Sequence, residues 1–243
     1  VADPCAISCE PFIQWVIEDN FVCGRPQWET AGVQMVENVL PWEQMKLRML
    51  NGSHSFLAYL GYLAGFQHIS DCMQDSAFRE AAYRLMLNEQ APTLQITDVD
   101  LDQYALSLLE RFANPALKHK TWQIAMDGSQ KLPQRMLEGI RVHLARQSEW
   151  PLLALGVAGW MRYVSGVDDS GTAIDVRDPL SEKIAALVKQ STESERVNAL
   201  LSLREIFATD LVQNPQFVAA IQQAWQRIAQ YGAHQAVIET LKS

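Results

Sequence analysis

Apolar residues recur at spacings of three and four along most of this chain of 243 residues, and this spacing constrains the fold more than any other feature. The clearest case covers residues 41–66, where Pro41 suits a first helical turn and Glu43 adds an acidic side chain to it. We predict a long, buried helix there. The same spacing predicts further helices over residues 75–90, 100–112, 115–126, 133–147, 152–164, 180–190, 193–207 and 214–230, and a last one in the C-terminal segment.

Extended structure has little support in the sequence, because the β-branched runs that several strands would need are missing. The candidates for an extended region lie in the opening stretch: Ile7, Phe12, Ile13, Trp15, Val16 and Ile17. Residues 167–179 combine Asp, Ser and Gly and end in proline, which predicts a loop. Their aspartates lack the spacing of an EF-hand, so we interpret the loop as a solvated turn. The predicted fold class is mainly α, as one compact helical domain over residues 1–243.

Composition excludes several classes of protein. A net charge of -8 repels polyanions, which argues against nucleic acid as a partner. The longest apolar run, residues 151–160, is too short to span a membrane. Cys5, Cys9, Cys23 and Cys72 form no C-x-x-C pair and no zinc-like spacing, so we expect buried free thiols, a reducing compartment such as the cytoplasm, and no metal.

Polar residues in the first long helix are the first candidates for chemistry. At about 100° per residue, Glu43, Lys46 and His54 fall within an arc of roughly 80°, and Asn51 lies about 60° beyond His54. Apolar residues surround this strip, which predicts a position at a cleft, where general acid–base catalysis is favoured. The alternative is a solvated lysine and a core histidine. Gly52 favours the first interpretation, because a glycine within a helix often permits the close approach of a ligand or another backbone.

The same residues resemble a known family. The run KLRMLNGSHS, with its K-x-x-x-x-N-x-x-H spacing, resembles the polyol-specific long-chain dehydrogenases, which include mannitol 2-dehydrogenase and the hexuronate reductases. CEPFIQWVIED and NPALKHKTWQIAMDGSQKLPQR extend the resemblance to essentially the whole chain. Within the family, the segments DPCAISCEPFIQWV, LPWEQMKLRMLNGSHSFLAYLGYL and GVAGWMRYVSGVDD resemble the bacterial D-mannonate oxidoreductases, also called fructuronate reductases. The implied fold is the helical C-terminal domain of mannitol dehydrogenases, which resembles that of 6-phosphogluconate dehydrogenase.

The resemblance implies a role for each polar residue of the strip. Lys46 would be the general acid and base that exchanges a proton with the substrate oxygen. Asn51 and His54 would hydrogen-bond that oxygen as negative charge develops on it. Glu43 would pass protons between Lys46 and bulk water.

A second candidate region is rich in basic residues. Residues 115–147 contain six Lys or Arg residues and two acidic residues, which would attract an anionic sugar acid or a pyrophosphate unless they form a solvated face. By resemblance, Lys131 matches a lysine that contacts substrate, and Gln123 stands where mannitol dehydrogenases have arginine. Lys118, His119 and Arg135 are further candidates for binding the substrate carboxylate.

A hydride transfer also requires a carrier, and the chain lacks the strand, Gly-rich turn and helix of a dinucleotide site. The resemblance implies that NAD binds mainly to an N-terminal Rossmann domain outside this chain, which begins at Val1 rather than methionine and so looks like part of a longer protein. The fragment alone should be inactive. Two alternatives stay open: a related polyol or hexuronate reductase, such as mannitol 2-dehydrogenase or tagaturonate reductase, and a helical interaction module without catalysis.

Overall fold

A computed structural model describes Cys5, Glu10, residues 12–97 and residues 99–242, and it confirms a mainly α fold. It divides the chain into an N-terminal unit, Val1–Gln44, and a helical unit, Met45–Ser243, where the sequence predicted one domain. In the described residues, no helix is both long and apolar enough to cross a membrane. Cys72 is buried as predicted, but Cys5 and Cys23 are exposed, and Cys9 lies outside the described residues.

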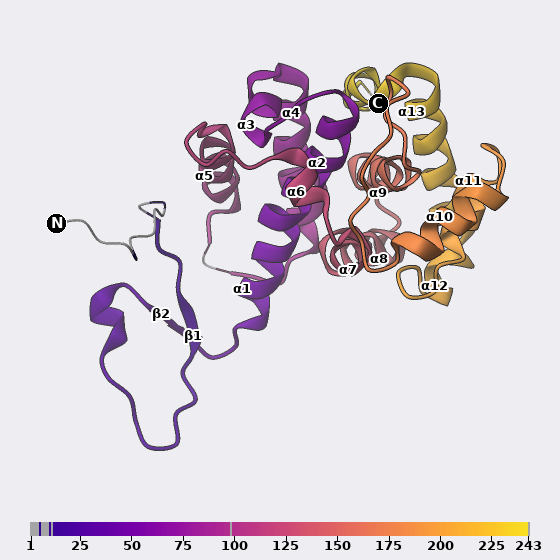
Figure 1. The fold of residues 1–243 in the computed structure, drawn as a ribbon. Coiled ribbons are helices and arrows are strands. Elements are labelled where there is room, and N and C mark those ends of the chain that lie inside the picture. The colour runs from indigo at the N-terminus through magenta and orange to yellow at the C-terminus, as the bar shows by residue number, and fades with distance from the viewer. Residues whose placement is uncertain (1–4, 6–9, 11, 98, 243) are drawn as a thin grey trace. The chain divides into compact units, whose positions relative to one another are not determined.

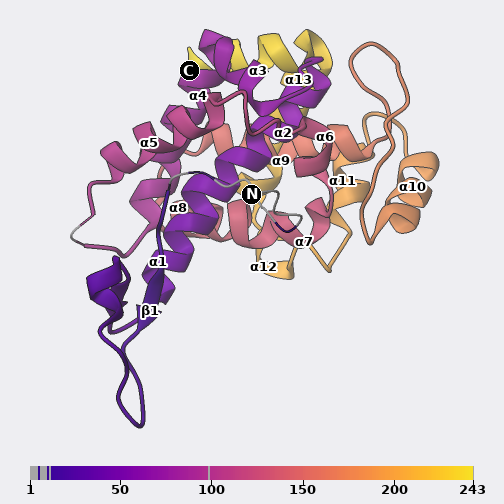
Figure 2. The ribbon, with the colours of Figure 1, turned by 60° about the vertical axis from the view of Figure 1, so that its left-hand side comes forward.

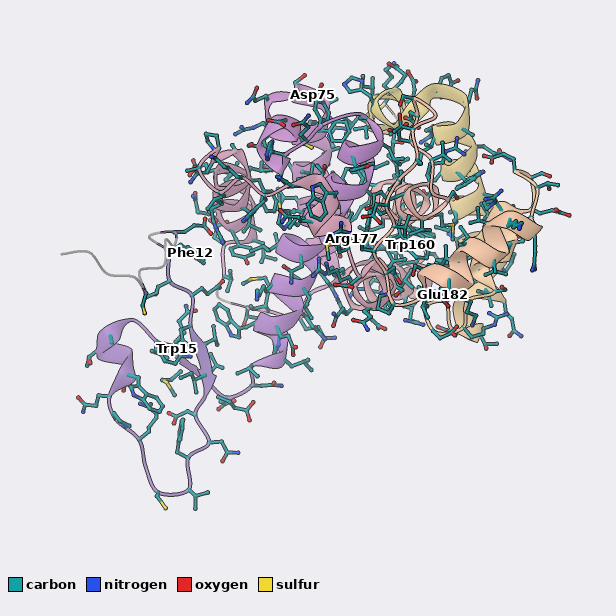
Figure 3. The ribbon with its side chains drawn as sticks, in the orientation of Figure 1. Phe12, Trp15, Asp75, Trp160, Arg177 and Glu182 are labelled. Atoms are coloured by element: carbon teal, nitrogen blue, oxygen red, sulfur yellow. The ribbon has the colours of Figure 1, made fainter. Side chains whose placement is uncertain are left out.

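The N-terminal unit contains two short parallel strands, β1 (Val16–Glu18) and β2 (Gln34–Val36), with Ile17 opposite Met35. A 3-10 turn, η1 (Trp28–Ala31), lies between them in the sequence. Extended structure was therefore predicted correctly at Val16 and Ile17, β2 was missed, and Ile7 lies outside the described residues. Large apolar side chains of this unit are exposed, among them Phe12 and Trp15 (Figure 3).

The helical unit is built around two nearly all-apolar helices. α9 (Pro151–Val164) packs between α2 (Ser53–Leu63) and α13 (Pro215–Leu241) (Figure 1). Both α2 and α9 are buried on almost every side, as expected for helices that are apolar around their whole circumference. Trp160 of α9 is fully buried among the helices of this unit (Figure 3).

Shorter helices surround this centre. One end of the unit holds α5, and α10 and α11 lie at the other (Figure 2). The bounds of the α-helices not yet given are α1 (Leu40–Met45), α3 (Ile69–Gln74), α4 (Ser76–Arg84), α5 (Leu101–Ala113), α6 (Thr121–Ala125), α7 (Gly128–Leu132), α8 (Glu138–Arg146), α10 (Ser181–Gln190), α11 (Arg196–Leu201) and α12 (Thr209–Val212).

Three segments of the helical unit are π-helical, with hydrogen bonds from residue i to i+5 that widen the coil. They are η2 (Lys46–Gly52), η3 (Leu85–Gln90) and η5 (Pro133–Leu137). Each continues directly into or out of an α-helix, and η3 is followed by a 3-10 turn, η4 (Ala91–Thr93). The predicted helices over 41–66, 75–90 and 133–147 are thus present, but they contain π turns that an α-helical period could not indicate.

Two predicted helices are wrong over most of their length. Residues 115–120 form turns and a bridge rather than a helix, because Lys118 has a left-handed φ of 48° and Lys120 pairs with His68, so that only Thr121–Ala125 is helical. In residues 193–207 the helix is limited to Arg196–Leu201.

The C-terminal helix is interrupted once. Gly232 has φ 74° and ψ 164° within α13, and the backbone N–H of Ala233 donates a hydrogen bond to Asp169 Oδ2 at 2.6 Å. Asp169 belongs to the predicted loop over 167–179, whose other aspartates also bind nearby backbone or side-chain groups: Asp168 binds Ser170 and Thr172, Asp175 binds Arg177, and Asp178 binds Ser129 and Leu180.

Candidate functional site

The π turn η2 sets the relation between Lys46 and Asn51. In a π-helix, the backbone N–H of residue i+5 donates to the carbonyl oxygen of residue i, so residues five apart differ less in direction than the roughly 140° that separates them on an α-helix. The arc predicted from 100° per residue is therefore wrong for this segment. The π turn brings the directions of Lys46 and Asn51 closer together than the α-helical period indicates.

The exposure of these residues differs from the expectation. Lys46 is exposed, and Asn51 and His54 are half-buried. Glu43 is exposed in the part of α1 that belongs to the N-terminal unit. Within the helical unit, Lys46 therefore faces solvent rather than lying in a closed cleft.

His54 lies in the most unusual environment of the four. Its ring stacks on Phe112 at 5.1 Å and approaches the ring of His119 at 5.4 Å. Burial lowers the pKa of His54 to about 3, and the positive charges of His119, Arg135, Lys131 and Arg111 act in the same direction. The imidazole is therefore neutral near pH 7, with one ring nitrogen as a donor and the other as an acceptor. Its Nε2 atom is buried and has no hydrogen-bond partner among the described residues.

Arg135 approaches the same helix from η5. One of its terminal nitrogens donates a hydrogen bond to Ser55 Oγ at 3.0 Å and a longer one to the backbone oxygen of Asn51 at 3.4 Å. The guanidinium is half-buried, and no ion pair among the described residues involves it. Its Nε atom is buried and has no hydrogen-bond partner among the residues that the structure describes. Arg135 is thus a cation whose charge is not neutralised locally.

Lys131 lies one helical turn before Arg135. Its ammonium donates to the backbone oxygens of Ile124 and Met126. Burial lowers the pKa of Lys131, and the nearby charge of Arg135 lowers it further. In the part of the chain that the structure describes, no carboxylate forms an ion pair with this ammonium.

The structure thus brings together His54, His119, Lys131 and Arg135, with Asn51 bonded through its backbone to Arg135. Gln123 is not joined to them: it is exposed on α6, and no side-chain hydrogen bond among the described residues links it to the group. Lys118 is also exposed.

Sequence reasoning missed several groups near His54. Arg111 and Phe112 both lie on α5. The sequence predicted this helix but not that it lies beside His54. Ser55 directly follows His54 in the chain, and this position beside a candidate residue is the one sequence signal that could have indicated it. Gly52 was interpreted as a sign of close approach, and this is confirmed: a Cβ atom there would lie 2.8 Å from the backbone oxygen of Arg135 and 2.9 Å from Gln90 Nε2.

Neither a metal nor a dinucleotide has a recognisable site in the described residues. They contain no group of three His, Cys, Asp or Glu side chains that could hold a metal ion. The described strands are the three-residue β1 and β2, and neither leads through a Gly-rich turn into a helix. The described residues therefore contain no Rossmann-type dinucleotide motif.

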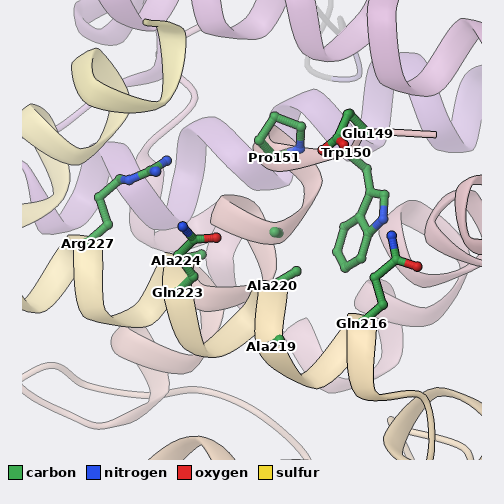
Figure 4. Close-up of a pocket in the computed structure, with 10 residues that line it drawn as sticks. Glu149, Trp150, Pro151, Gln216, Ala219, Ala220, Gln223, Ala224 and Arg227 are labelled. Carbon is green, nitrogen blue, oxygen red and sulfur yellow. The ribbon is translucent and has the colours of Figure 1, made fainter. Parts of the chain in front are cut away.

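A separate hollow of about 450 Å³ lies between α13 and the start of α9 (Figure 4). Alanines of α13 and Pro151 line much of it, and Arg227 and Glu149 stand at its margin. None of the residues near His54 lines it, so it is not part of the cationic group described above.

Comparison with known proteins also assigns different families to the beginning and the rest of the chain. Residues 38–229 match the family described as Mannitol dehydrogenase C-terminal domain, and residues 1–30 match the Mannitol dehydrogenase Rossmann domain. The chain is 77% identical to "Uncharacterized oxidoreductase YeiQ" of Escherichia coli over 100% of the chain and 50% of that protein. It is 58% identical to E. coli "D-mannonate oxidoreductase" over 98% of this chain and 49% of that protein.

A solved structure agrees. Pseudomonas fluorescens mannitol 2-dehydrogenase, in a ternary complex with NAD and D-mannitol, superposes with a TM-score of 0.89 at 37% identity, covering 97% of this chain and 48% of that one. The chain thus spans about half the length of the relatives it matches, and the resemblance indicated by KLRMLNGSHS is confirmed. The chain belongs to the mannitol dehydrogenase family.

Proposed function

We propose that this chain is the substrate-binding and catalytic C-terminal half of an NAD-dependent oxidoreductase that interconverts D-fructuronate and D-mannonate. The 58% identity to a D-mannonate oxidoreductase supports this substrate pair, and the complex of mannitol 2-dehydrogenase with NAD supports the cofactor. The observation that carries the proposal is the group of half-buried cations beside His54, because a carboxylate is the natural partner of such charges.

In this proposal, the other half of the enzyme is a Rossmann domain. The match of residues 1–30 to that domain supports this. The two parallel strands of the N-terminal unit also support it, since parallel sheets normally have both faces covered and a two-stranded sheet is marginally stable alone. The exposed side chains of Ile13, Trp15 and Val22 provide apolar surface for the remainder of that domain to cover.

The hydride chemistry belongs to NAD, for which the described residues offer no site. What this chain supplies acts on the substrate oxygen. Lys46 gives a proton to the carbonyl oxygen during reduction and removes it from the hydroxyl during oxidation. Asn51 and the neutral ring of His54 donate hydrogen bonds to that oxygen as it becomes negative. Glu43, one α-helical turn before Lys46, exchanges the proton with water.

The substrate carboxylate is assigned to Arg135, with the charge of Lys131 and the ring of His119 beside it. A guanidinium can hold a carboxylate through two parallel hydrogen bonds, which also fixes its orientation. Gln123, which stands where mannitol dehydrogenases have arginine, is a weaker candidate because it is exposed and apart from this group.

The test uses a matched substrate pair and the purified two-domain enzyme. D-Fructuronate and D-fructose differ in whether one end carries a carboxylate or a hydroxymethyl group. We expect NADH-dependent reduction of fructuronate with a kcat/KM at least 30-fold above that for fructose, the ratio expected when about 2 kcal/mol of charge-assisted binding is lost. Equal rates on both substrates would refute the sugar-acid assignment and favour a mannitol 2-dehydrogenase-like specificity.

A further inference from the structure

The three π turns of the helical unit meet at one buried side chain. η2 contacts both η3 and η5, although η3 begins only at Leu85 and η5 only at Pro133. Gln90, the last residue of η3, is completely buried at this junction. Because π turns occur frequently at functional sites, a residue shared by three of them is a candidate for a role in that site.

The amide of Gln90 makes one hydrogen bond and is closely packed on both sides, and its Oε1 atom is buried without a hydrogen-bond partner among the described residues. Its Nε2 atom donates a hydrogen bond of 2.9 Å to the backbone oxygen of Arg135 in η5. A Cβ atom on Gly52, at the end of η2, would lie 2.9 Å from the same nitrogen. On the other side, a Cβ atom on Gly139 of α8 would lie 2.9 Å from Gln90 Oε1. Both positions are therefore filled by glycine, since any larger side chain would strike the amide.

This junction connects directly to the groups assigned to the substrate. Gly52 follows Asn51 in the chain, so the amide packs against the backbone next to Asn51. Arg135 is fixed twice: its backbone oxygen accepts from Gln90, and its side chain donates to Ser55 Oγ and to Asn51 O. Movement of the Gln90 amide would therefore displace Asn51 and Arg135 relative to each other.

We propose that Gln90 is a positioning residue that sets the distance between η2 and η5, and hence between Asn51 and Arg135. It touches neither substrate nor cofactor. The inference rests on the proposed function, because Asn51 and Arg135 must hold the two ends of one substrate for their spacing to matter. A displacement of about 1 Å at such a site can lower the rate on the order of 100-fold.

The experiment is a double-mutant cycle in the two-domain enzyme. Gln90→Ala removes the amide, and we expect kcat for fructuronate to fall tenfold or more with the KM for NADH unchanged. Gly139→Ala adds one methyl group against Gln90 Oε1 and leaves the Arg135 bond in place; it should lower kcat at least fivefold. In the Gln90→Ala background the same methyl group has no amide to strike, so the further loss should be less than twofold.

Gly159→Ala is the matched control. Its Cβ atom would lie 2.8 Å from Leu60 Cδ2 in the α2–α9 contact, a similar crowding without Gln90. We expect a lower melting temperature and a kcat within twofold of the wild type. An equal loss of kcat in Gly139→Ala and Gly159→Ala would overturn the inference, as would the same effect of Gly139→Ala in both backgrounds or a kcat within twofold of the wild type for Gln90→Ala. If Gln90→Ala does not fold, the kcat values of Gly139→Ala and Gly159→Ala decide between the two outcomes.

Failure of this inference differs from failure of the proposed function. A folded wild-type enzyme with no activity on fructuronate would refute the proposed function. An active wild type whose kcat is insensitive to Gln90→Ala and Gly139→Ala would refute the positioning role alone.

Discussion

Among the described residues of the helical unit, the buried polar side chains around Glu89 and those around His54 differ in whether their atoms are hydrogen-bonded. At the start of α9, the carboxyl group of Glu89 accepts hydrogen bonds from the backbone N–H groups of Leu152 and Leu153 at 2.8 and 2.7 Å. His143 contacts Ser148 Oγ through Nδ1 and the backbone oxygen of Glu89 through Nε2. Near Asn51, in contrast, His54 Nε2 and Arg135 Nε are buried without partners among the described residues.

The difference separates a structural group from a candidate site. Buried polar atoms are normally hydrogen-bonded, and an exception needs a reason, such as a ligand that completes the bonding. Glu89 caps α9 and needs no ligand. The group around His54 combines unsatisfied atoms with several positive charges, which is the arrangement expected where an anion binds.

The largest effect should come from Lys46. In the two-domain enzyme, Lys46→Ala should lower kcat by roughly 10² to 10⁴, because it removes the group that exchanges the proton. The affinity for NAD should change little. The measurement is the pH profile of oxidation, in which a basic ionisation of the wild type should be absent from the variant. Persistence of that ionisation, with a rate loss below tenfold, would make Lys46 a structural residue.

The next largest effect concerns the group around His54, which contains buried polar atoms without partners among the described residues. Asn51→Ala and His54→Ala should each lower kcat by about 10² to 10³, since each removes a donor to the developing oxyanion. The double variant should lose less than the product of the two effects, because both donors act on one oxygen. Steady-state kinetics of the four proteins measure this, and strictly multiplicative losses would argue against a shared oxygen.

A smaller effect concerns substrate choice. Arg135→Met should reduce the ratio of kcat/KM for fructuronate over fructose by about 30-fold, because the carboxylate loses its buried partner. Arg146→Met is the matched control: Arg146 is an exposed arginine of the same basic region, and it is not among the residues that lower the pKa of His54. An unchanged ratio in Arg135→Met would move the carboxylate site elsewhere.

The smallest expected effects lie in stability, where the two groups have opposite signs. The pKa of His54 is lowered from 6.5 to about 3, so only the unfolded chain binds that proton between these values, and stability falls as the pH falls. Burial raises the pKa of Glu89 from 4.5 to about 8, so the folded chain keeps a proton that the unfolded chain releases, and stability falls as the pH rises through this range.

Melting curves of the two-domain enzyme from pH 4 to pH 8, followed by the helical circular dichroism signal, would measure both slopes. His54→Asn should flatten the acidic side and Glu89→Gln the neutral side. Glu89→Gln should also cost about 1–3 kcal/mol of stability, because one backbone N–H of α9 loses its acceptor. Its kcat should stay within twofold of the wild type, and a large loss would mean that the cap and the candidate site are coupled.

The sequence was sufficient for helices whose own pattern determines them. α9 was predicted within a residue, since an apolar run that begins at Pro151 is helical and buried in any mainly α context. Residues 115–126 failed because their course depends on partners outside the segment: Thr121 Oγ1 bonds to the backbone oxygen of Phe66, and Lys120 pairs with His68. No local spacing contains that information.

The candidate site shows the same limit. Lys46, Asn51 and His54 were found through their spacing in one segment, but the reason for a spacing of five became visible only with the π turn. Glu89 and Gln90 were not singled out. Their partners, Leu152 and Arg135, lie 63 and 45 residues away, and a buried Glu or Gln in a helical segment looks in sequence like an exposed one.

The break at Gly232 has a consequence for how the unit opens. A helix from residue 215 to 241 would be expected to exchange its amide hydrogens as one cooperative block, but this one consists of two helices, the second of which begins at an amide held by Asp169. The second helix has its own N-terminal cap, because the backbone N–H of Ala233 binds Asp169 in a loop more than 60 positions earlier. Ala233, Ala236 and Val237 are nevertheless fully buried, and Arg227 donates a hydrogen bond to Thr240 across the break. Residues 233–241 can therefore open on their own only by breaking these contacts, and we expect amide exchange to change at Gly232 rather than along one continuous helix.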